Sequence, residues 1–531
     1  MKNLKPILTS CLTPHLLMLL LGLLYFAWLQ SCYKYHFFYQ EQNQLFLLTP
    51  DWWLTYFSRP AWTACLVGDW LTQFYYYLYA GPSILAMCLL LVGESVRKAL
   101  MQARLDNLPA TAIAIIAMTI EVLFSLHYGY RLSSILCVCG GAAMFSLCHL
   151  RRWPKVWAEA IADAVGGILS FWMFGYGMLV FMLLVVVKGR VVCYASLLAT
   201  LCLVPLTKRV FLLDYPALFT YPGIGTFVKP ETALEDFFEV DNEYYFGNYS
   251  KVAAIVESKT APSQYDLFYY NLVMAQRYRL PEVLMKYPSN YLGTFETVGP
   301  STPTLTLKCI NELYWLLGDM TFAERAAMLS MVSSPANRNI RMVKRLAEIN
   351  VVSGDTLAAR KYLRLLQHTF VWRRWASDML SALSQPGNHQ GVMKEYAGKA
   401  NFINRADTLR LSDNAYVIMH ELLESNPKNR VALDYLLCSD LLLKDIATFK
   451  RDYDQFALRP ENAEAMSATK IYQEALMIYL AGTHAPEDEW RKYIVRQDVI
   501  RRFADYNCRR GDASFRDTYW YYFDMTKRRK S

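Results

Sequence analysis

Residues 79–96 read YAGPSILAMCLLLVGESV, and residues 132–150 read LSSILCVCGGAAMFSLCHL. A helix needs about 20 apolar residues to cross the hydrocarbon core of a bilayer, and both stretches come close to that length. They lie inside an apolar block, residues 79–213, that has no counterpart in the rest of the chain. The sequence therefore predicts an all-α protein that begins with a polytopic transmembrane domain, residues 1–213, and continues as a soluble helical domain.

Basic residues predict how the first spans are oriented. The apolar run 7–29 follows Lys2 and Lys5, and later basic residues gather at 97–104 and 151–155. Because Lys and Arg are retained on the cytoplasmic side, this pattern places the N-terminus in the cytoplasm. A signal peptide is the alternative for the first run, but the run is long for one and no small-residue cleavage site follows it.

The segment 153–187 is too long for one simple span, and Gly175-Tyr176-Gly177 interrupts it. A helical hairpin that turns at these glycines keeps the basic residues before and after it on one side of the membrane, and we prefer it to a single tilted helix. The last apolar run, 191–206, then leads outward, although Lys208 and Arg209 oppose that direction. The chain would have six or seven spans, with the C-terminal domain outside the cytoplasm.

Residues 33–78 form an aromatic loop with few basic residues, as expected on the outer side. Apolar residues recur at helical spacing in 45–57 and 62–76, which predicts two amphipathic helices at the membrane interface. Glu41 and Asp51 lie in this loop. Paired carboxylates beside a membrane cavity could act as a general base or bind a cation, whereas the simpler reading is the polar face of an interfacial helix.

Glu121 is the acidic residue placed deepest in a predicted span, 109–126, with His127 and Arg131 close by in sequence. A charge at that depth costs about 2.5–3.5 kcal/mol unless it is paired or faces water. The sequence therefore predicts either a functional carboxylate or one neutralised by His127 or Arg131. Glu159 and Asp163 are further acidic residues at the start of the interrupted segment.

The remainder of the chain consists of a linker, 214–232, and a helical domain, 233–531. One pattern recurs there after 36 residues: Glu312-Leu313, Gly318-Asp319, Ala323 and Leu329 match Glu348-Ile349, Gly354-Asp355, Ala359 and Leu365. This period is close to the 34 residues of a tetratricopeptide helix-turn-helix repeat. Weaker units lie at 237–258, 265–287 and 415–443. The sequence predicts a tetratricopeptide-like array, with an irregular helical bundle as the alternative.

Charge and cysteine usage narrow the classes of function. Of the 55 Lys and Arg residues, 15 precede residue 214, as do 8 of the 46 Asp and Glu residues, which gives net charges of about +7 for the first part and +2 for the remainder. The helical domain is thus nearly neutral, and a nucleic-acid partner is not expected. There is no CxxC or HExxH pattern. No metal site and no cofactor are predicted. The basic end, 527–530, could touch anionic lipid.

Five stretches of the chain carry a family resemblance: Glu41-Gln42-x-Gln44-Leu45-Phe46, Gln73-Phe74-Tyr75-Tyr76, Asn426-Pro427-x-Asn429, Tyr472-Gln473-Glu474-Ala475 and Thr518-Tyr519-Trp520-Tyr521-Tyr522. Together they resemble an uncharacterised bacterial family of multi-pass membrane proteins with a tetratricopeptide-like tail. The resemblance covers most of the chain and implies the same architecture without an activity. Members of that family tend to have Pro-Gly-Gly in the first loop, where this chain has Pro60-Ala61-Trp62.

A looser similarity is to polytopic glycosyltransferases that use lipid-linked sugars, which place an acidic residue just after the first span. Glu41, or Asp51 in second place, matches that position. The leading hypothesis is instead a bacterial inner-membrane scaffold, not an enzyme, whose helical domain binds a protein while its spans contact membrane lipid. The glycosyltransferase, with a lipid-linked sugar as substrate, is the alternative. A transporter using Glu121 is a third.

Overall fold

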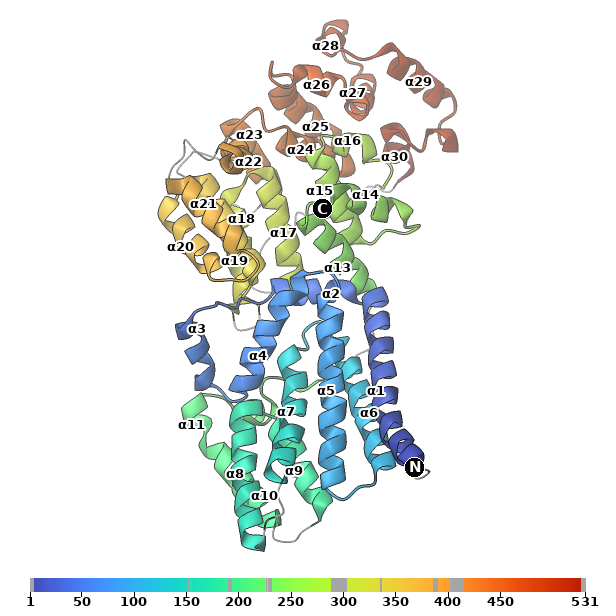
Figure 1. Ribbon diagram of the computed structural model, residues 1–531. Helices are drawn as coiled ribbons and strands as arrows, with labels where there is room; N and C mark the ends of the chain where they lie inside the picture. The colour runs from blue at the N-terminus through green and yellow to red at the C-terminus, as the bar shows by residue number, and fades with distance from the viewer. Residues whose placement is uncertain are drawn as a thin grey trace. The chain divides into compact units, whose positions relative to one another are not determined.

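A computed structural model describes residues 4–150, 153, 155–189, 193–225, 227, 232–287, 303–334, 337–384, 390–401, 403 and 414–526. Within these ranges the chain is helical and contains no β-strand (Figure 1). The all-α prediction is confirmed. The predicted basic end at 527–530 and two basic residues before the interrupted segment, Arg151 and Arg152, lie outside the described residues.

The chain forms two compact units. The N-terminal unit comprises Met1–Phe238 together with Arg338–Ile340 and Leu365–Trp375, and the C-terminal unit comprises Glu239–Asn337, Arg341–Arg364 and Ala376–Ser531. The sequence had suggested a linker at 214–232 and a single crossing from one domain to the next. In the structure two short later segments belong to the N-terminal unit as well.

The helices of the N-terminal unit follow the apolar runs of the sequence. They are α1 (Leu4–Cys32), α2 (Lys34–Gln42), α3 (Pro50–Leu54), η1 (Thr55–Ser58), α4 (Trp62–Thr72), η2 (Gln73–Tyr76), α5 (Ala80–Gln102), α6 (Asn107–Ser125), α7 (Leu132–Cys148), α8 (Val156–Phe174), α9 (Gly177–Lys188), α10 (Cys193–Leu206), α11 (Lys208–Phe211) and α12 (Tyr215–Thr220). Three described segments, Thr13–Cys32, Asn107–Ser125 and Val156–Phe174, are long and apolar enough to cross a membrane. The predicted total of six or seven spans stays a prediction.

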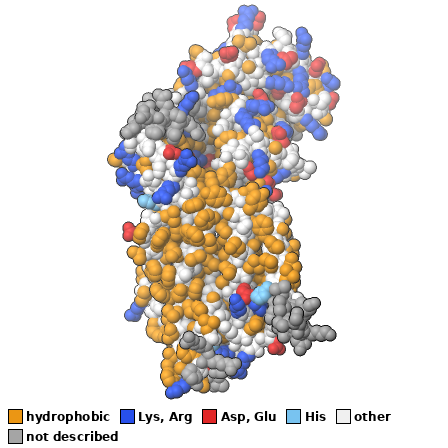
Figure 2. Space-filling model, viewed as in Figure 1, with side chains coloured by type: hydrophobic (Ala, Val, Ile, Leu, Met, Phe, Trp, Pro, Cys, Tyr) orange, Lys and Arg blue, Asp and Glu red, His pale blue; other side chains and the backbone are white. Residues whose placement is uncertain are grey.

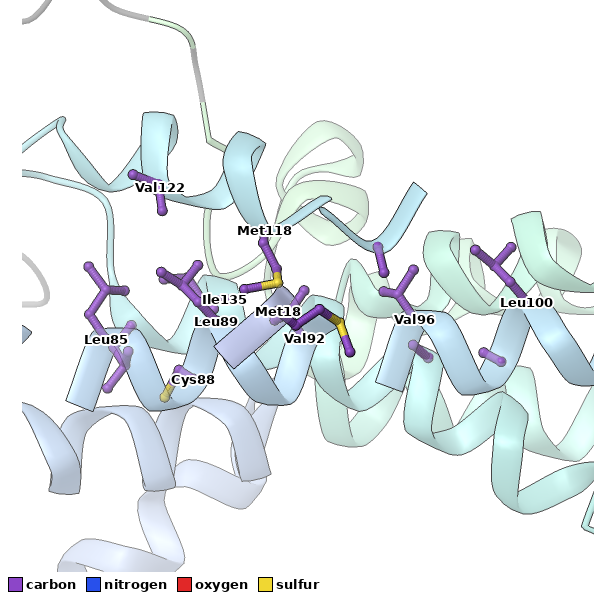
Figure 3. Close-up of a cluster of buried hydrophobic side chains, with 14 of the residues drawn as sticks. Met18, Leu85, Cys88, Leu89, Val92, Val96, Leu100, Met118, Val122 and Ile135 are labelled. Carbon is purple, nitrogen blue, oxygen red and sulfur yellow. The ribbon is translucent and has the colours of Figure 1, made fainter. Parts of the chain in front are cut away.

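A core of apolar side chains joins α1, α5, α6 and α7 (Figure 3). Leu85, Leu89 and Val92 project from α5 toward Met118 of α6 and Ile135 of α7, and all are buried. At Gly93 a Cβ atom would lie 2.5 Å from the Met118 sulfur, so a larger residue would have to displace the Met118 side chain. Such close helix contacts through small residues are common in membrane proteins, where packing rather than water drives association.

Helices α8 and α9 form the hairpin that the glycine break predicts. Gly175 adopts a left-handed φ of 51° between them. The Lys188 ammonium in the last turn of α9 lies 2.5 Å from Glu159 Oε1 in the first turn of α8, so the helices run back along one another. His149, which follows α7, contacts Asp163 of α8 at 3.2 Å. The acidic residues of this segment are therefore buried and paired.

The loop after α1 differs in part from its prediction. The helix expected over 62–76 is present as α4 and η2, but the one expected over 45–57 is wrong in its first half. Residues 44–48 are not helical, and helix α3 begins only at Pro50, whose fixed φ suits a first helical position. The Leu48 N–H donates to the His368 carbonyl at 2.7 Å, a long-range bond that competes with helix formation.

Large apolar side chains cover the outside of the N-terminal unit. Leu24 of α1, Ile116 of α6 and Leu183 of α9 are 62%, 56% and 63% exposed. Figure 2 shows hydrophobic side chains over most of the visible face of these helices. An apolar surface of this extent is expected where the surrounding medium is not water.

The C-terminal unit is built from short helices. They are α13 (Thr232–Tyr245), which enters the unit at Glu239, α14 (Tyr249–Ser258), α15 (Gln264–Gln276), α16 (Leu280–Val283), α17 (Thr304–Leu317), α18 (Met320–Val332), α19 (Ile340–Ser353), α20 (Thr356–Gln367), α21 (Arg373–Ser384), α22 (Gln390–Ala400), α23 (Ala415–Ser425), α24 (Arg430–Leu442), α25 (Ile446–Asp452), η5 (Tyr453–Ala457), α26 (Ala463–Ser467), α27 (Lys470–Gly482), α28 (Glu487–Lys492), α29 (Gln497–Cys508), η6 (Ala513–Phe515) and α30 (Tyr519–Met525).

The 36-residue recurrence corresponds to two helix pairs, α17 with α18 and α19 with α20. Their turns contain Gly318 and Gly354, which adopt left-handed φ angles of 87° and 81°. Glycine takes this conformation without steric cost, which explains why the turn is the best-matched part of the two sequences. The weaker units at 237–258, 265–287 and 415–443 also contain helices separated by turns, near Gly247, Tyr278 and 426–429. Whether the unit is a tetratricopeptide-like array stays a prediction.

Candidate anion site in the C-terminal unit

A cavity of about 160 Å³ lies within the C-terminal unit. Its charged lining residues are Arg341, Lys344, Arg345, Lys399, Glu312 and Glu348, and its aromatic lining residues are Tyr244, Tyr245, Tyr249, Trp315 and Tyr396. The cavity is thus polar, with four basic groups and two acidic ones. This composition favours a ligand that is anionic and also offers a flat or apolar surface.

Helix α19 supplies most of the charged lining. Arg341, Lys344, Arg345 and Glu348 are spaced by three and four residues, so they share one face of the helix. Trp315 and Glu312 come from α17, and Lys399 comes from α22. Three helices that are well separated in the chain therefore meet at this cavity.

Arg341 is the best-buried charge of the site, with a side chain that is 1% exposed. Its guanidinium donates to Asp241 at 2.8 Å and to Glu312 at 3.0 Å. Burial alone would raise the pKa of Asp241, but the adjoining guanidinium outweighs burial and holds that pKa below its ordinary value. Asp241 therefore stays ionised. It does not line the cavity itself, and its contact with the guanidinium holds Arg341 in place.

Glu348 sits between two basic groups of its own helix. Lys344 donates to it at 2.7 Å, and Arg345 lies 3.1 Å away. Burial acts to raise the pKa of Glu348, but Lys344 and Arg345 together lower it. The Tyr396 hydroxyl also donates to Glu348, at 3.3 Å. Glu348 therefore stays ionised, and it orders the basic groups that contact it.

Aromatic rings hold the cations in position. The Arg345 guanidinium lies 4.4 Å from the centre of the Trp315 ring, and the Lys399 ammonium lies 4.7 Å from the same ring. Arg341 lies 4.6 Å from the ring of Tyr245. Cation–π contacts of this kind are each worth about 0.5–2 kcal/mol. They order long side chains that would otherwise lose entropy on binding a ligand, so the site is pre-organised.

A model for a family of unknown function, DUF6057, matches residues 10–526. The chain belongs to this family. No curated protein matches it, and no solved structure matches it either. The predicted resemblance to an uncharacterised family is confirmed, and membership in DUF6057 adds no activity to what the site shows.

In this DUF6057 member Glu41 and Asp51 differ in their surroundings. Glu41 is buried at the end of α2 and lines a space of about 10 Å³ with Gln44, Phe46 and Gln73. A space of that size holds about one water molecule. Asp51 is exposed in the first turn of α3. The catalytic role considered for these two residues stays a prediction.

Glu121, His127 and Arg131 are brought together more closely. His127 and Arg131 line a cavity of about 170 Å³ in the N-terminal unit, as does Tyr130. Glu121 is 4% exposed, and it accepts a hydrogen bond from the Tyr130 hydroxyl at 2.7 Å. The partner of this carboxylate is therefore a tyrosine, not the histidine or arginine that the sequence suggested.

Sequence reasoning missed the cavity of the C-terminal unit. Glu312 and Glu348 served there only as markers of the 36-residue recurrence. The signal that could have found the site is the basic run Arg341-x-x-Lys344-Arg345 on one helical face, combined with a tryptophan three residues after Glu312. Within the described part of the chain, no group of three or more His, Cys, Asp and Glu side chains is placed to hold a metal ion.

Proposed function

We propose that this chain is a multi-pass protein of the bacterial inner membrane that serves as a scaffold, and that its C-terminal unit binds an acidic segment of a partner protein. Three described helices have the length and apolarity of membrane spans, which supports the membrane assignment. The N-terminus lies in the cytoplasm and the C-terminal unit outside it, by the distribution of basic residues. The spans anchor the binding unit and contact membrane lipid.

The cavity of the C-terminal unit is the observation that carries this proposal. Its basic lining residues outnumber its acidic ones, and Trp315 and Tyr245 lie beneath the cations. Carboxylates prefer the fork of an arginine or an adjacent ammonium, and the aromatic rings can pack against the peptide between them. When Asp241 behind Arg341 is counted, three carboxylates accompany the four basic groups, so a neutral sugar or metabolite would leave one positive charge uncompensated.

A direct binding experiment tests the proposal. Purified full-length protein in detergent is titrated with a fluorescent hexaglutamate peptide and, separately, with a hexalysine peptide. We expect binding of the acidic peptide only, weakening as salt is added because screening acts on charge pairs. The double variant Lys344→Gln, Lys399→Gln should bind at least tenfold more weakly, since it removes two ammonium groups while keeping a polar side chain at each position.

The matched control is Arg491→Gln, which alters a basic residue of the same unit whose side chain is 70% exposed and does not line the cavity. It should bind as the unaltered protein does. Equal binding of both peptides, or equal loss in the control, would overturn the proposed acidic ligand. Reporters fused at Ser531 test the membrane arrangement separately. We expect activity from a reporter that works only outside the cytoplasm and no activity from one that works only inside it.

A further inference from the structure

A second cavity, about 170 Å³ in volume, lies within the N-terminal unit where α6 ends and α7 begins. It is lined by residues around the start of α7, namely His127, Gly129, Tyr130, Arg131 and Ser134, and by residues 222–225. Its volume is several times the ~30 Å³ that one water occupies in the liquid. It therefore has room for a small polar group.

The loop that closes this cavity is held firmly. The Ser134 hydroxyl donates to the Gly223 carbonyl at 2.8 Å, and the Tyr176 N–H donates to the Tyr221 carbonyl at 3.0 Å. At Gly225 a Cβ atom would lie 2.2 Å from the ring of Phe124, so no larger residue fits there without displacement. The cavity is a built feature of the unit and not a gap beside a loose loop.

Arg131 brings a positive charge to the cavity lining and is half-buried. Among the described residues its guanidinium makes no hydrogen bond and no ion pair. Two carboxylates of the same unit have other partners: Asp69 accepts from the Tyr56 hydroxyl at 2.8 Å, and Glu121 accepts from the Tyr130 hydroxyl at 2.7 Å. Asp69 and Arg131 attract each other only at longer range. A guanidinium has five N–H donors, and here they remain available to a ligand.

His127 adds a second donor. Its Nδ1 accepts a hydrogen bond from the Gly129 N–H at 3.1 Å. In the neutral ring the hydrogen must then be on Nε2, which makes that atom a donor. An arginine and an imidazole N–H in the wall of one cavity suit a tetrahedral oxyanion better than a cation or an apolar group.

We propose that this cavity binds a phosphate group, with Arg131 as the principal donor and His127 as the second. The site lies at the end of Asn107–Ser125, one of the segments long enough to span a bilayer, at the level where lipid headgroups would be found. The phosphate can therefore come from a phospholipid headgroup or from free phosphate. The site is independent of the acidic-segment site, because the two lie in different units.

The experiment compares both sources on purified full-length protein. In detergent, inorganic phosphate is added at constant ionic strength and the unfolding temperature is followed, with chloride as reference. In parallel, the protein is purified with phosphatidylglycerol present, and retained lipid is measured by native mass spectrometry. We expect stabilisation by phosphate, retention of the anionic lipid, or both; phosphate alone identifies a free ligand, and lipid alone identifies a headgroup.

Variants locate the binding. Arg131→Gln should reduce the affinity at least tenfold and His127→Gln several-fold, whereas Arg104→Gln, an exposed arginine before the opposite end of α6, should leave it unchanged. Circular dichroism confirms that each variant is folded, and His127→Gln provides a second reading should Arg131→Gln unfold. The proposal is overturned if neither phosphate nor lipid binds, or if binding by Arg131→Gln and His127→Gln equals that of the unaltered protein, or if Arg104→Gln weakens it as much as Arg131→Gln.

Discussion

Both units are helical, but they differ in how many large apolar side chains their surfaces expose. Helices of the N-terminal unit turn large apolar side chains outward along whole faces, as at Leu24, Ile116 and Leu183, whereas the C-terminal unit exposes only scattered ones such as Leu357 and Ile494. The difference teaches that the medium, and not helix propensity, decides which side of each helix is apolar. Lipid accepts apolar side chains that water rejects.

Helix starts differ in the same sense. Between residues 33 and 214, none of the described N-cap residues bonds its helix through a side chain. In the C-terminal unit, Ser263, Asp319, Asn414, Asn429 and Asp445 all do so. A short helix in water depends on its caps to satisfy free N–H groups. The absence of such caps at the described helix starts of the N-terminal unit fits the membrane location proposed for its longer helices.

The largest effect is expected from Arg341→Met in the C-terminal unit. The change leaves Asp241 and Glu312 buried beside an apolar side chain, and removing one partner of a buried ion pair costs about 3–5 kcal/mol. Thermal unfolding of the purified chain should shift strongly downward. Arg491→Met, which removes an arginine from a pair that is 70% and 79% exposed, should change little. Similar shifts in the two variants would contradict the assigned role of Arg341.

A nearly as large effect is expected from Asp434→Asn as pH is varied. Burial raises the pKa of Asp434 from 3.8 to about 7, so the folded state keeps a proton that the unfolded state loses. The contribution of Asp434 to the free energy of unfolding is fully present below pH 4. It decreases by about 1.4 kcal/mol per pH unit as the pH rises to 7. The variant keeps an oxygen for the Tyr472 hydroxyl and should lose this slope. An unchanged slope in urea unfolding between pH 4 and 7 would refute the assignment.

A smaller effect, about 3 kcal/mol, is expected from Ile116→Arg in the N-terminal unit. Ile116 is 56% exposed at the middle of α6, and arginine at the centre of a span costs about 2.5–3.5 kcal/mol on insertion. The fraction of protein that resists alkaline extraction from membranes should fall. Leu357→Arg, at a position 79% exposed in α20, should have no such effect because that surface already faces water. Normal membrane insertion of Ile116→Arg would break the contrast between the units.

The smallest effect is expected from Ser263→Ala. Ser263 and Asp266 form a capping box at the start of α15, with bonds of 3.1 Å and 2.8 Å. Its loss should cost about 1 kcal/mol, seen as a modest decrease in the unfolding temperature. Thr49→Ala provides the comparison, because Thr49 precedes α3 and makes no side-chain cap bond. An equal decrease of the unfolding temperature in the two variants would show that the side-chain cap bond of Ser263 does not stabilise the protein.

Local patterns explain why some elements were predictable from the sequence. Apolar runs placed α1 and α5–α10, and the glycines at 175 and 177 predicted the hairpin of α8 and α9. The spacing of 36 located the turns at Gly318 and Gly354. The helix expected over 45–57 failed because a long-range bond from Leu48 to His368 replaces a local one. Helical spacing of apolar residues indicates a possible amphipathic helix. It does not indicate whether a distant residue will bind the backbone N–H groups that the helix would need.

The sequence by itself determined the helical fold, the apolar first part and the near-neutral second part, because helix formation and solvent preference are properties of short stretches. Only the tertiary structure decided which charges meet. Arg341 contacts Asp241 from 100 residues away, and Arg131 shares a cavity with residues 222–225. Helix packing sets these encounters, and it depends on the shapes of all the buried side chains together, which no single stretch of sequence contains.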